Sequence, residues 1–337
     1  MIKKRLSDTI CLSLLFAIVL AISAFLVACE VPAMNPSANV SEGQILIPET
    51  PAPEINTEPA PSEPVSYSDP NIPANIASGI NVEANDKAII DYSNIRDGYV
   101  MAEFRQQTDT DIRVILDTPD GVRYTYTIFP GGGFGVFPLS GGDGKYNIAI
   151  YEKIEGTKYA LVISTELDVV LTNPFVPFLR PNQFVNYDKD SKVVAKAVEL
   201  TESAESFIDI ISAVYHFVVE DIDYDREMAE NIQKGYIPDL DQVMEQHKGI
   251  CFDYAALMTA MLRSRWIPTK MIFGNTLNTY HAWISVYSED EGWIDNIIFF
   301  DGENWRLMDP TFAASTDPDS LLEYIGDGTN YEEMFQY

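Results

Sequence analysis

The chain has few positively charged residues, few histidines and few cysteines. Its 337 residues include 22 Lys and Arg against 51 Asp and Glu, which gives a formal net charge of −29 at pH 7. Nucleic-acid binding depends on cationic side chains that neutralise phosphates, so this charge balance excludes a nucleic-acid partner. Anionic lipid headgroups would also repel the chain, and attachment to a membrane therefore requires a specific anchor.

The first 29 residues predict such an anchor. Three basic residues at positions 3–5 precede an uncharged run at 9–28, which is typical of an export signal. The run ends in Leu26-Val27-Ala28-Cys29, which resembles the lipobox of bacterial lipoproteins. This resemblance implies that residues 1–28 are removed and that Cys29 is acylated as the mature N-terminus. An uncleaved signal-anchor helix is the alternative, because such a run can just span a bilayer. Both interpretations predict an extracytoplasmic, membrane-anchored protein at the cell surface.

The scarcity of cysteine draws attention to the third one. Cys11 lies inside the predicted signal and Cys29 carries the predicted lipid, which leaves Cys251 as a single free thiol. Exported proteins usually pair their cysteines or avoid them, so an unpaired thiol calls for a reason. Cys251 is either a small buried apolar residue or a reactive group.

Composition divides the rest of the chain into three segments. Residues 29–75 carry 10 of the 20 prolines among Ser, Thr, Asn and Glu, which predicts a linker. Residues 76–175 contain short runs of β-branched and aromatic residues separated by turn signals such as Pro119-Asp120-Gly121, which favours an all-β sandwich of immunoglobulin-like size. The expected strands cover 88–92, 99–104, 112–116, 122–129, 146–151 and 159–164. Residues 176–337 form the remaining predicted domain.

A glycine-rich run, Gly131-Gly132-Gly133-Phe134-Gly135, invites comparison with phosphate-binding loops. No helix with a Lys-Ser/Thr pair follows it, so we interpret it as a connection between strands.

The period of the apolar residues changes to helical spacing after residue 174. Helices are predicted over 193–200 and 207–218. Asp239, with Gln242 three residues later, is typical of an N-cap that opens another short helix.

Cys251 is predicted to lie at a helix N-terminus. A glycine turn at Gly249 leads into a run of good helix formers, and this run has to end before Pro268. The partial positive charge at a helix N-terminus favours the thiolate over the thiol, as a nucleophile requires.

A nucleophilic thiol needs a base, and the chain offers three histidines. His216 lies in an apolar helical stretch, where a packing or surface role is expected, and His247 has no strand to hold it. His281 opens an alternating stretch that is typical of a strand, which would fix the position of its ring. Asp309 ends the next predicted strand, because a proline follows it, and could orient the imidazole.

Three motifs together resemble the transglutaminase-like superfamily, a papain-like group of proteins. They are Gly249-Ile250-Cys251-x-Asp253-Tyr254-Ala255, His281-Ala282-Trp283 and Trp305-x-x-x-Asp309-Pro310-Thr311. The resemblance covers roughly 192–312. It implies an α+β fold in which a helix carries the cysteine and an antiparallel sheet carries the histidine and aspartate.

The resemblance also implies a Cys251, His281 and Asp309 triad. The thiolate would attack a carboxamide carbonyl, His281 would assist loss of the amine, and the acyl-enzyme would pass to water or to another amine. The Cys251 backbone N–H is expected in the oxyanion hole, with Tyr224 or Gln246 as a further donor. Trp283 is a candidate for lining a peptide groove, although strand tryptophans also commonly belong to the core.

Other kinds of site fit less well. A zinc site built from the same three residues lacks a short-spaced ligand pair to nucleate it. The run 221–225 resembles the start of a calcium loop, but Arg226 and Ile232 occupy the positions where Gly and Glu are required. We therefore expect no metal and no cofactor.

The expected function is a lipid-anchored cysteine peptidase or amidase that acts on a peptide or protein substrate. Hydrolysis is favoured over cross-linking, because nothing in the sequence marks a second, amine-binding site. Cell-wall peptides are candidate substrates on the ground of location alone. The alternative is a catalytically inactive binding module on the same fold. The sequence leaves the oligomeric state open.

Overall fold

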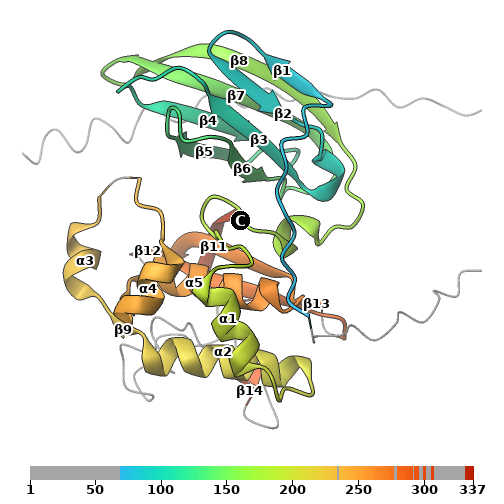
Figure 1. Cartoon of the computed structure of the whole chain (residues 1–337), viewed down its shortest axis with the longest axis vertical. Coiled ribbons are helices and arrows are strands. Elements are labelled where there is room, and N and C mark those ends of the chain that lie inside the picture. The colour runs from blue at the N-terminus through green and yellow to red at the C-terminus, as the bar shows by residue number, and fades with distance from the viewer. Residues whose placement is uncertain are drawn as a thin grey trace, which may run out of the picture. The chain divides into compact units, whose positions relative to one another are not determined.

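The computed structural model of the chain describes residues 69–233, 235–276, 279–290, 292–295, 299–300, 305–306 and 331–337. Two groups of elements follow one another along these residues, first strands and then a mixed set of helices and strands (Figure 1). The predicted signal, Cys29 and most of the predicted linker lie outside the described residues.

Eight strands make up the first group, and they form two antiparallel four-stranded sheets. One sheet has the order β1-β2-β3-β6 and the other β5-β4-β7-β8. The strands are β1 Val82–Ala84, β2 Ala88–Asp91, β3 Tyr99–Phe104, β4 Ile112–Asp117, β5 Arg123–Ile128, β6 Gly135–Pro138, β7 Gly144–Glu155 and β8 Lys158–Val169. The six strands expected from sequence are present, and β1 and β6 are additional. The glycine-rich run leads into β6, as expected for a connection between strands.

Side-chain alternation explains how these strands bury one face. In β4, Ile112, Val114 and Leu116 are fully buried while the residues between them are partly exposed. Their neighbours across the ladder in β5, Ile128, Tyr126 and Tyr124, are also buried. Because successive side chains of a strand point to opposite faces, this pattern places one face of the sheet in the core.

Five α-helices are described in the second group. They are α1 Lys192–Leu200, α2 Phe207–Asp221, α3 Arg226–Asn231, α4 Leu240–Gln246 and α5 Cys251–Ser264, and two short 3-10 helices, η1 Ile95–Asp97 and η2 Val176–Leu179, lie earlier in the chain. The Asp239 side chain accepts a hydrogen bond from the Gln242 backbone N–H, so the predicted N-cap opens α4. Helix α5 is buried along nearly its whole length and packs against α1, α2 and α4 and against strands that lie beside it in the second group.

The second group contains one four-stranded antiparallel sheet and two small strand pairs. The sheet has the order β13-β12-β11-β16, and the pairs are β9 with β10 and β14 with β15. The strands are β9 Asp223–Tyr224, β10 Lys248–Gly249, β11 Thr269–Thr276, β12 Thr279–Ser288, β13 Gly292–Ile294, β14 Phe299–Phe300, β15 Trp305–Arg306 and β16 Tyr331–Gln336. Together with the helices, this sheet makes the second group an α+β fold, as the sequence predicts.

Strand β16 comes from the acidic end of the chain, for which no strand is expected from sequence. It pairs with β11, and the following residue, Tyr337, exchanges backbone hydrogen bonds with Met271 in both directions. The buried Arg263 guanidinium of α5 donates to the Tyr337 carbonyl and to the Thr269 carbonyl. Tyr124 of β5 reaches the same strand, since its hydroxyl donates to the Gln336 carbonyl. The end of the chain thus links α5, the sheet and the β-rich group.

Residues at the end of the predicted linker contact the second group. The Asn71 backbone N–H donates to the Ser264 carbonyl, and its side chain donates to the Arg263 and Leu179 carbonyls.

In the described part of the chain, no helix has the length and hydropathy needed to cross a membrane.

Candidate active site

Cys251 is the first residue of α5 and the one cysteine among the described residues. Its side chain is half-buried, so the thiol stands at the rim of the core. Ile250 is the N-cap, and its apolar side chain cannot accept a hydrogen bond. The Asp253 carboxylate instead accepts from the Ile250 backbone N–H at 2.8 Å, which supplies one half of a capping box. The sequence prediction of a helix-borne thiol is therefore confirmed in its position.

Asp253 fixes the first turn of α5. Its carboxylate has no exposed area, and its second oxygen accepts a hydrogen bond from the Tyr236 hydroxyl at 2.6 Å. Burial raises the pKa of this carboxyl, while the bonds from Ile250 and Tyr236 act in the opposite direction. The backbone packs tightly here, because a Cβ on Gly249 would meet the Asp253 side chain at 2.7 Å. Asp253 and Tyr236 therefore hold the residues on either side of the thiol.

The parallel pair of β9 and β10 brings Tyr224 close to the thiol in the structure. Tyr224 pairs with Gly249, two residues before Cys251, and the Asp225 N–H donates to the Gly249 carbonyl at 2.8 Å. The Tyr224 ring also contacts that of Tyr254, with centroids 6.2 Å apart. Of the two predicted oxyanion candidates, Tyr224 is thus attached to the strand that leads into α5, whereas Gln246 is an exposed residue at the end of α4.

The ends of β11 and β12 lie beside the first turn of α5. Phe252, which follows the thiol, packs edge-on against Phe273 of β11 with ring centroids 4.8 Å apart. Phe273 in turn stacks on Tyr280 of β12 at 5.8 Å. The pKa of the Tyr280 phenol is raised, first by burial and then by an electrostatic contribution from the neighbouring Cys251 side chain. Tyr280 is nonetheless 55% exposed, so its ring forms part of the accessible surface next to the thiol.

His281 follows Tyr280 directly, and it is buried. It pairs with Gly274 across the ladder, and its ring lies parallel to that of Trp283 at 6.3 Å. Because alternate residues of a strand face opposite sides, Tyr280 shares a face with Phe273, and His281 shares the other face with Trp283. The helix that carries the predicted nucleophile and the strand that carries the predicted base are neighbours, and the His281 side chain lies on the face of the strand opposite to that of Phe273, which contacts the first turn of the helix.

Trp283 packs in the interior. It is 2% exposed and makes an edge-on contact with Tyr331 of β16, with ring centroids 5.1 Å apart. In the described structure it supports the strand that carries His281 and does not line an open groove. The predicted third member of the triad, Asp309, lies outside the described residues.

The other two histidines contact groups on α2. His216 is exposed on α2, where its Nδ1 is 3.0 Å from a Glu220 carboxylate oxygen. His247 closes α4 in the left-handed region, with φ of 51°, and its Nδ1 is 3.0 Å from the Asp221 carbonyl oxygen. Among the described residues, no cluster of His, Cys, Asp and Glu side chains could hold a metal ion.

Two residues of the site were missed in the sequence. Tyr236 lies in an irregular segment far from any motif, and only its contact with Asp253 reveals its place. Tyr280 immediately precedes the histidine motif, so the alternation of β12 could have indicated that its ring occupies the face opposite to His281.

A thiol at the start of a buried helix, beside an antiparallel sheet in an α+β fold, is the arrangement of a papain-like thiol-enzyme fold. Residues 194–296 match the family model described as the transglutaminase-like superfamily. The match includes Cys251 and His281 and ends before Asp309. It agrees with the family resemblance recognised in the sequence. No curated protein sequence matches the chain.

Solved structures that the chain matches include a candidate cysteine protease from Cytophaga hutchinsonii, at 14% identity and a TM-score of 0.35, with 77% of this chain and 74% of that chain covered. Red sea bream transglutaminase matches at 12% identity and a TM-score of 0.30, with 65% of this chain and 48% of that chain covered. A candidate protease from Parabacteroides distasonis matches at 9% identity and a TM-score of 0.26, with 62% and 64% covered. This chain thus spans about half the length of the fish transglutaminase.

Proposed function

We propose that the chain is a thiol enzyme that acts on peptide or amide bonds through an acyl-enzyme on Cys251. The observation that carries the proposal is the half-exposed thiol at a fixed helix N-terminus, inside the segment that matches the transglutaminase-like superfamily. His281 is the proposed base, because its motif resembles that of the transglutaminase-like superfamily and lies inside the matched segment, and Asp309 is the proposed partner of its ring.

The chemistry follows from these roles. The Cys251 sulfur attacks the carbonyl carbon while His281 takes the thiol proton, and the carbonyl oxygen becomes an oxyanion. The Cys251 backbone N–H points out of the helix N-terminus and can donate to that oxygen, and Tyr224, which pairs with the strand leading into α5, is the favoured side-chain candidate. Collapse of the intermediate breaks the C–N bond, and the amine leaves with the proton from His281. Water then attacks the thioester, which releases the acid and regenerates the thiol.

We propose hydrolysis rather than cross-linking as the main outcome. Cross-linking needs a place for a second amine, and the sequence marks no such site. The half-exposed thiol is also open to water on one side. A cysteine peptidase or amidase is therefore the favoured activity, and cell-wall peptides are candidate substrates.

The proposed setting is the outer face of a bacterial membrane. The export signal and the Cys29 lipid anchor predicted from sequence support this location, and the Pro-rich segment would hold the domain away from the bilayer. The two β-sheets of residues 82–169 support an immunoglobulin-like sandwich placed before the catalytic domain.

Alkylation of the single accessible thiol tests the proposal. The rate of carboxamidomethylation by iodoacetamide is measured from pH 5 to pH 9 for the wild type and for His281→Ala, with Tyr280→Phe as the matched control on the same strand. We expect rapid alkylation at pH 6 that falls at least tenfold in His281→Ala and by less than twofold in Tyr280→Phe.

A thiol that is slow at pH 6 in the wild type, or unaffected by His281→Ala, would contradict the enzyme proposal and favour an inactive binding module. A larger loss in Tyr280→Phe than in His281→Ala would transfer the activating role to the tyrosine. If the thiol is reactive, release of acid rather than incorporation of a primary amine into a glutamine peptide is the expected product.

A further inference from the structure

A cavity lies at one end of the β5-β4-β7-β8 sheet, where residues from all four strands line it. Its volume is about 470 Å³, and its wall combines the cations Arg113 and Lys153 with the aromatic rings of Phe129 and Tyr159. Phe129 is 61% exposed, which is unusual for a large apolar side chain in a folded domain. The cavity therefore offers both positive charge and flat apolar surface.

One of the two cations already has a counter-ion. Arg113 forms an ion pair with Asp111 at 3.0 Å and lies over the Tyr159 ring at 4.5 Å, and the Tyr159 hydroxyl donates to the same carboxylate. The pKa of Asp111 is lowered although burial acts to raise it, because these hydrogen bonds and the charges of Arg113 and Lys153 outweigh burial. Lys153 makes no ion pair within the described ranges of the chain. The cavity thus keeps one uncompensated positive charge.

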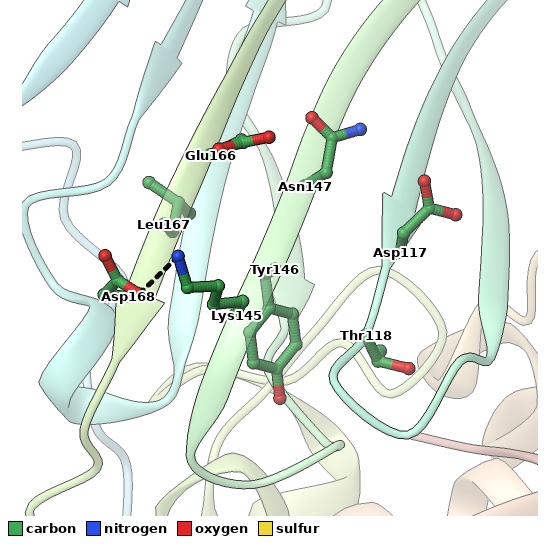
Figure 2. Close-up of a pocket in the computed structure, with 8 residues that line it drawn as sticks. All are labelled: Asp117, Thr118, Lys145, Tyr146, Asn147, Glu166, Leu167 and Asp168. Atoms are coloured by element: carbon green, nitrogen blue, oxygen red, sulfur yellow. Dashed lines mark ion pairs between the residues drawn. The ribbon is translucent and has the colours of Figure 1, made fainter.

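Another cavity, on the same sheet, has the opposite balance. Figure 2 shows Lys145 directed toward Asp168, with which it pairs at 3.8 Å, while Asp117 and Glu166 line the same hollow. Lys145 and Lys153 both belong to β7. In a chain with a net charge of −29, an excess of positive charge in a cavity is a local exception.

Two sets of contacts connect the positive cavity with the first turn of α5. Its rim includes Gly235, which precedes Tyr236, and Tyr236 bonds to Asp253 in the first turn of α5. The Thr127 carbonyl on its wall accepts a hydrogen bond from Gln183 at 2.6 Å. The next residue, Phe184, packs against Phe252 with ring centroids 5.6 Å apart. An extended substrate at Cys251 could therefore reach this cavity.

We propose that this cavity, lined by Arg113, Lys153, Phe129 and Tyr159, binds a carboxylate of an acidic peptide substrate away from the bond that is cleaved. That the peptide is a substrate rests on the proposed function, whereas the binding of an acidic peptide in the cavity does not. The Lys153 ammonium provides the charge for the carboxylate, and the two aromatic rings cover the apolar part of the residue that bears it.

Binding measurements on the full chain carrying Cys251→Ala, in non-ionic detergent, test this inference. The probes are acetyl-Ala-Ala-Ala-Glu with free carboxylates and the uncharged acetyl-Ala-Ala-Ala-Gln amide, titrated by calorimetry at low salt. We expect the acidic peptide to bind about fivefold more tightly, as a partly exposed ion pair allows, and the preference to shrink in 0.5 M salt. Lys153→Met should abolish the preference, and Lys145→Met, which removes a charge from the same strand, should retain it.

Equal affinities for the two peptides would overturn the inference, and so would an equal loss in Lys145→Met, which would indicate a general charge effect. Because the test uses a variant without the thiol, its result is independent of catalysis. A chain whose thiol is unreactive but which still prefers the acidic peptide would refute the enzyme and retain the cavity as a peptide-binding site. A reactive thiol with no peptide preference would refute the cavity as a peptide-binding site and retain the enzyme.

Discussion

Replacing Tyr236 by Phe should destabilise the protein through the carboxylate that anchors the thiol helix. The substitution keeps the ring and its edge contact with Phe252, but it removes the hydroxyl that donates to Asp253 at 2.6 Å. Asp253 is fully buried, and in the described structure its carboxylate also accepts a hydrogen bond from the Ile250 N–H. A hydrogen bond to a charged group contributes about 1.5–3 kcal/mol. We expect a loss of about 2 kcal/mol at pH 8, or roughly 4–8 °C in Tm for a unit of this size.

The free energy of unfolding lost in Tyr236→Phe should be larger at high pH than at low pH. Burial raises the pKa of Asp253 above its unfolded value, so the native state binds more protons than the unfolded state between the two values. Stability from this group is therefore present at low pH and is lost as the pH rises through the folded pKa. The Tyr236 hydroxyl opposes the rise, and removing it raises the folded pKa further. The cost of Tyr236→Phe should thus be largest where Asp253 is ionised and should shrink toward about 1 kcal/mol at pH 4.5.

Urea unfolding at pH 4.5 and pH 8 provides the measurement, and Tyr254→Phe provides the control. The Tyr254 hydroxyl is buried near the same helix but donates to an uncharged acceptor, the Ile222 carbonyl. Its removal should cost the same at both pH values. An equal cost of Tyr236→Phe at the two pH values, or an equal pH dependence in Tyr254→Phe, would refute the assignment of Asp253 as the charged partner.

Two further substitutions test the packing behind the site. Arg263→Met should lower the free energy of unfolding, measured in urea, by more than about 3 kcal/mol. The Arg263 guanidinium, whose pKa burial lowers to about 10, donates to three backbone carbonyls that would lose their partner. A loss below about 1 kcal/mol would contradict this role. Gly274→Ala should separate β16 from β11, because its Cβ would overlap the Glu332 carbonyl and the Trp283 ring. The expected loss in the free energy of unfolding exceeds about 2 kcal/mol. A thermal unfolding temperature equal to that of the wild type would contradict this, because it would show that β16 can shift to accommodate the added methyl group.

Local sequence signals predicted the elements that carry the site. The thiol helix follows from a glycine turn, a run of good helix formers and a downstream proline, and the structure has α5 at Cys251–Ser264. The capping pattern at Asp239 and the alternation around His281 identify α4 and β12 in the same way. These signals are informative because helix caps and strand alternation depend on residues that are only a few positions apart in the chain.

Long-range contacts decided what local signals could not. The acidic stretch Tyr331–Gln336 has no strand pattern of its own, and it becomes β16 because β11 offers it backbone partners and a glycine leaves room for its approach. The pairing of Tyr224 with Gly249 and the bond from Tyr236 to Asp253 likewise join residues that no spacing rule relates.

The sequence by itself thus determined the helix that begins at Cys251 and the strand that carries His281, because the signals for each element are contiguous in the chain. Only the tertiary structure decided what surrounds them. The exposed Tyr280 beside the thiol, the buried carboxylate beneath it and the cavity with an uncompensated lysine all arise where segments distant in the chain meet. Such neighbours depend on how separate elements pack, and packing is a property of the whole fold.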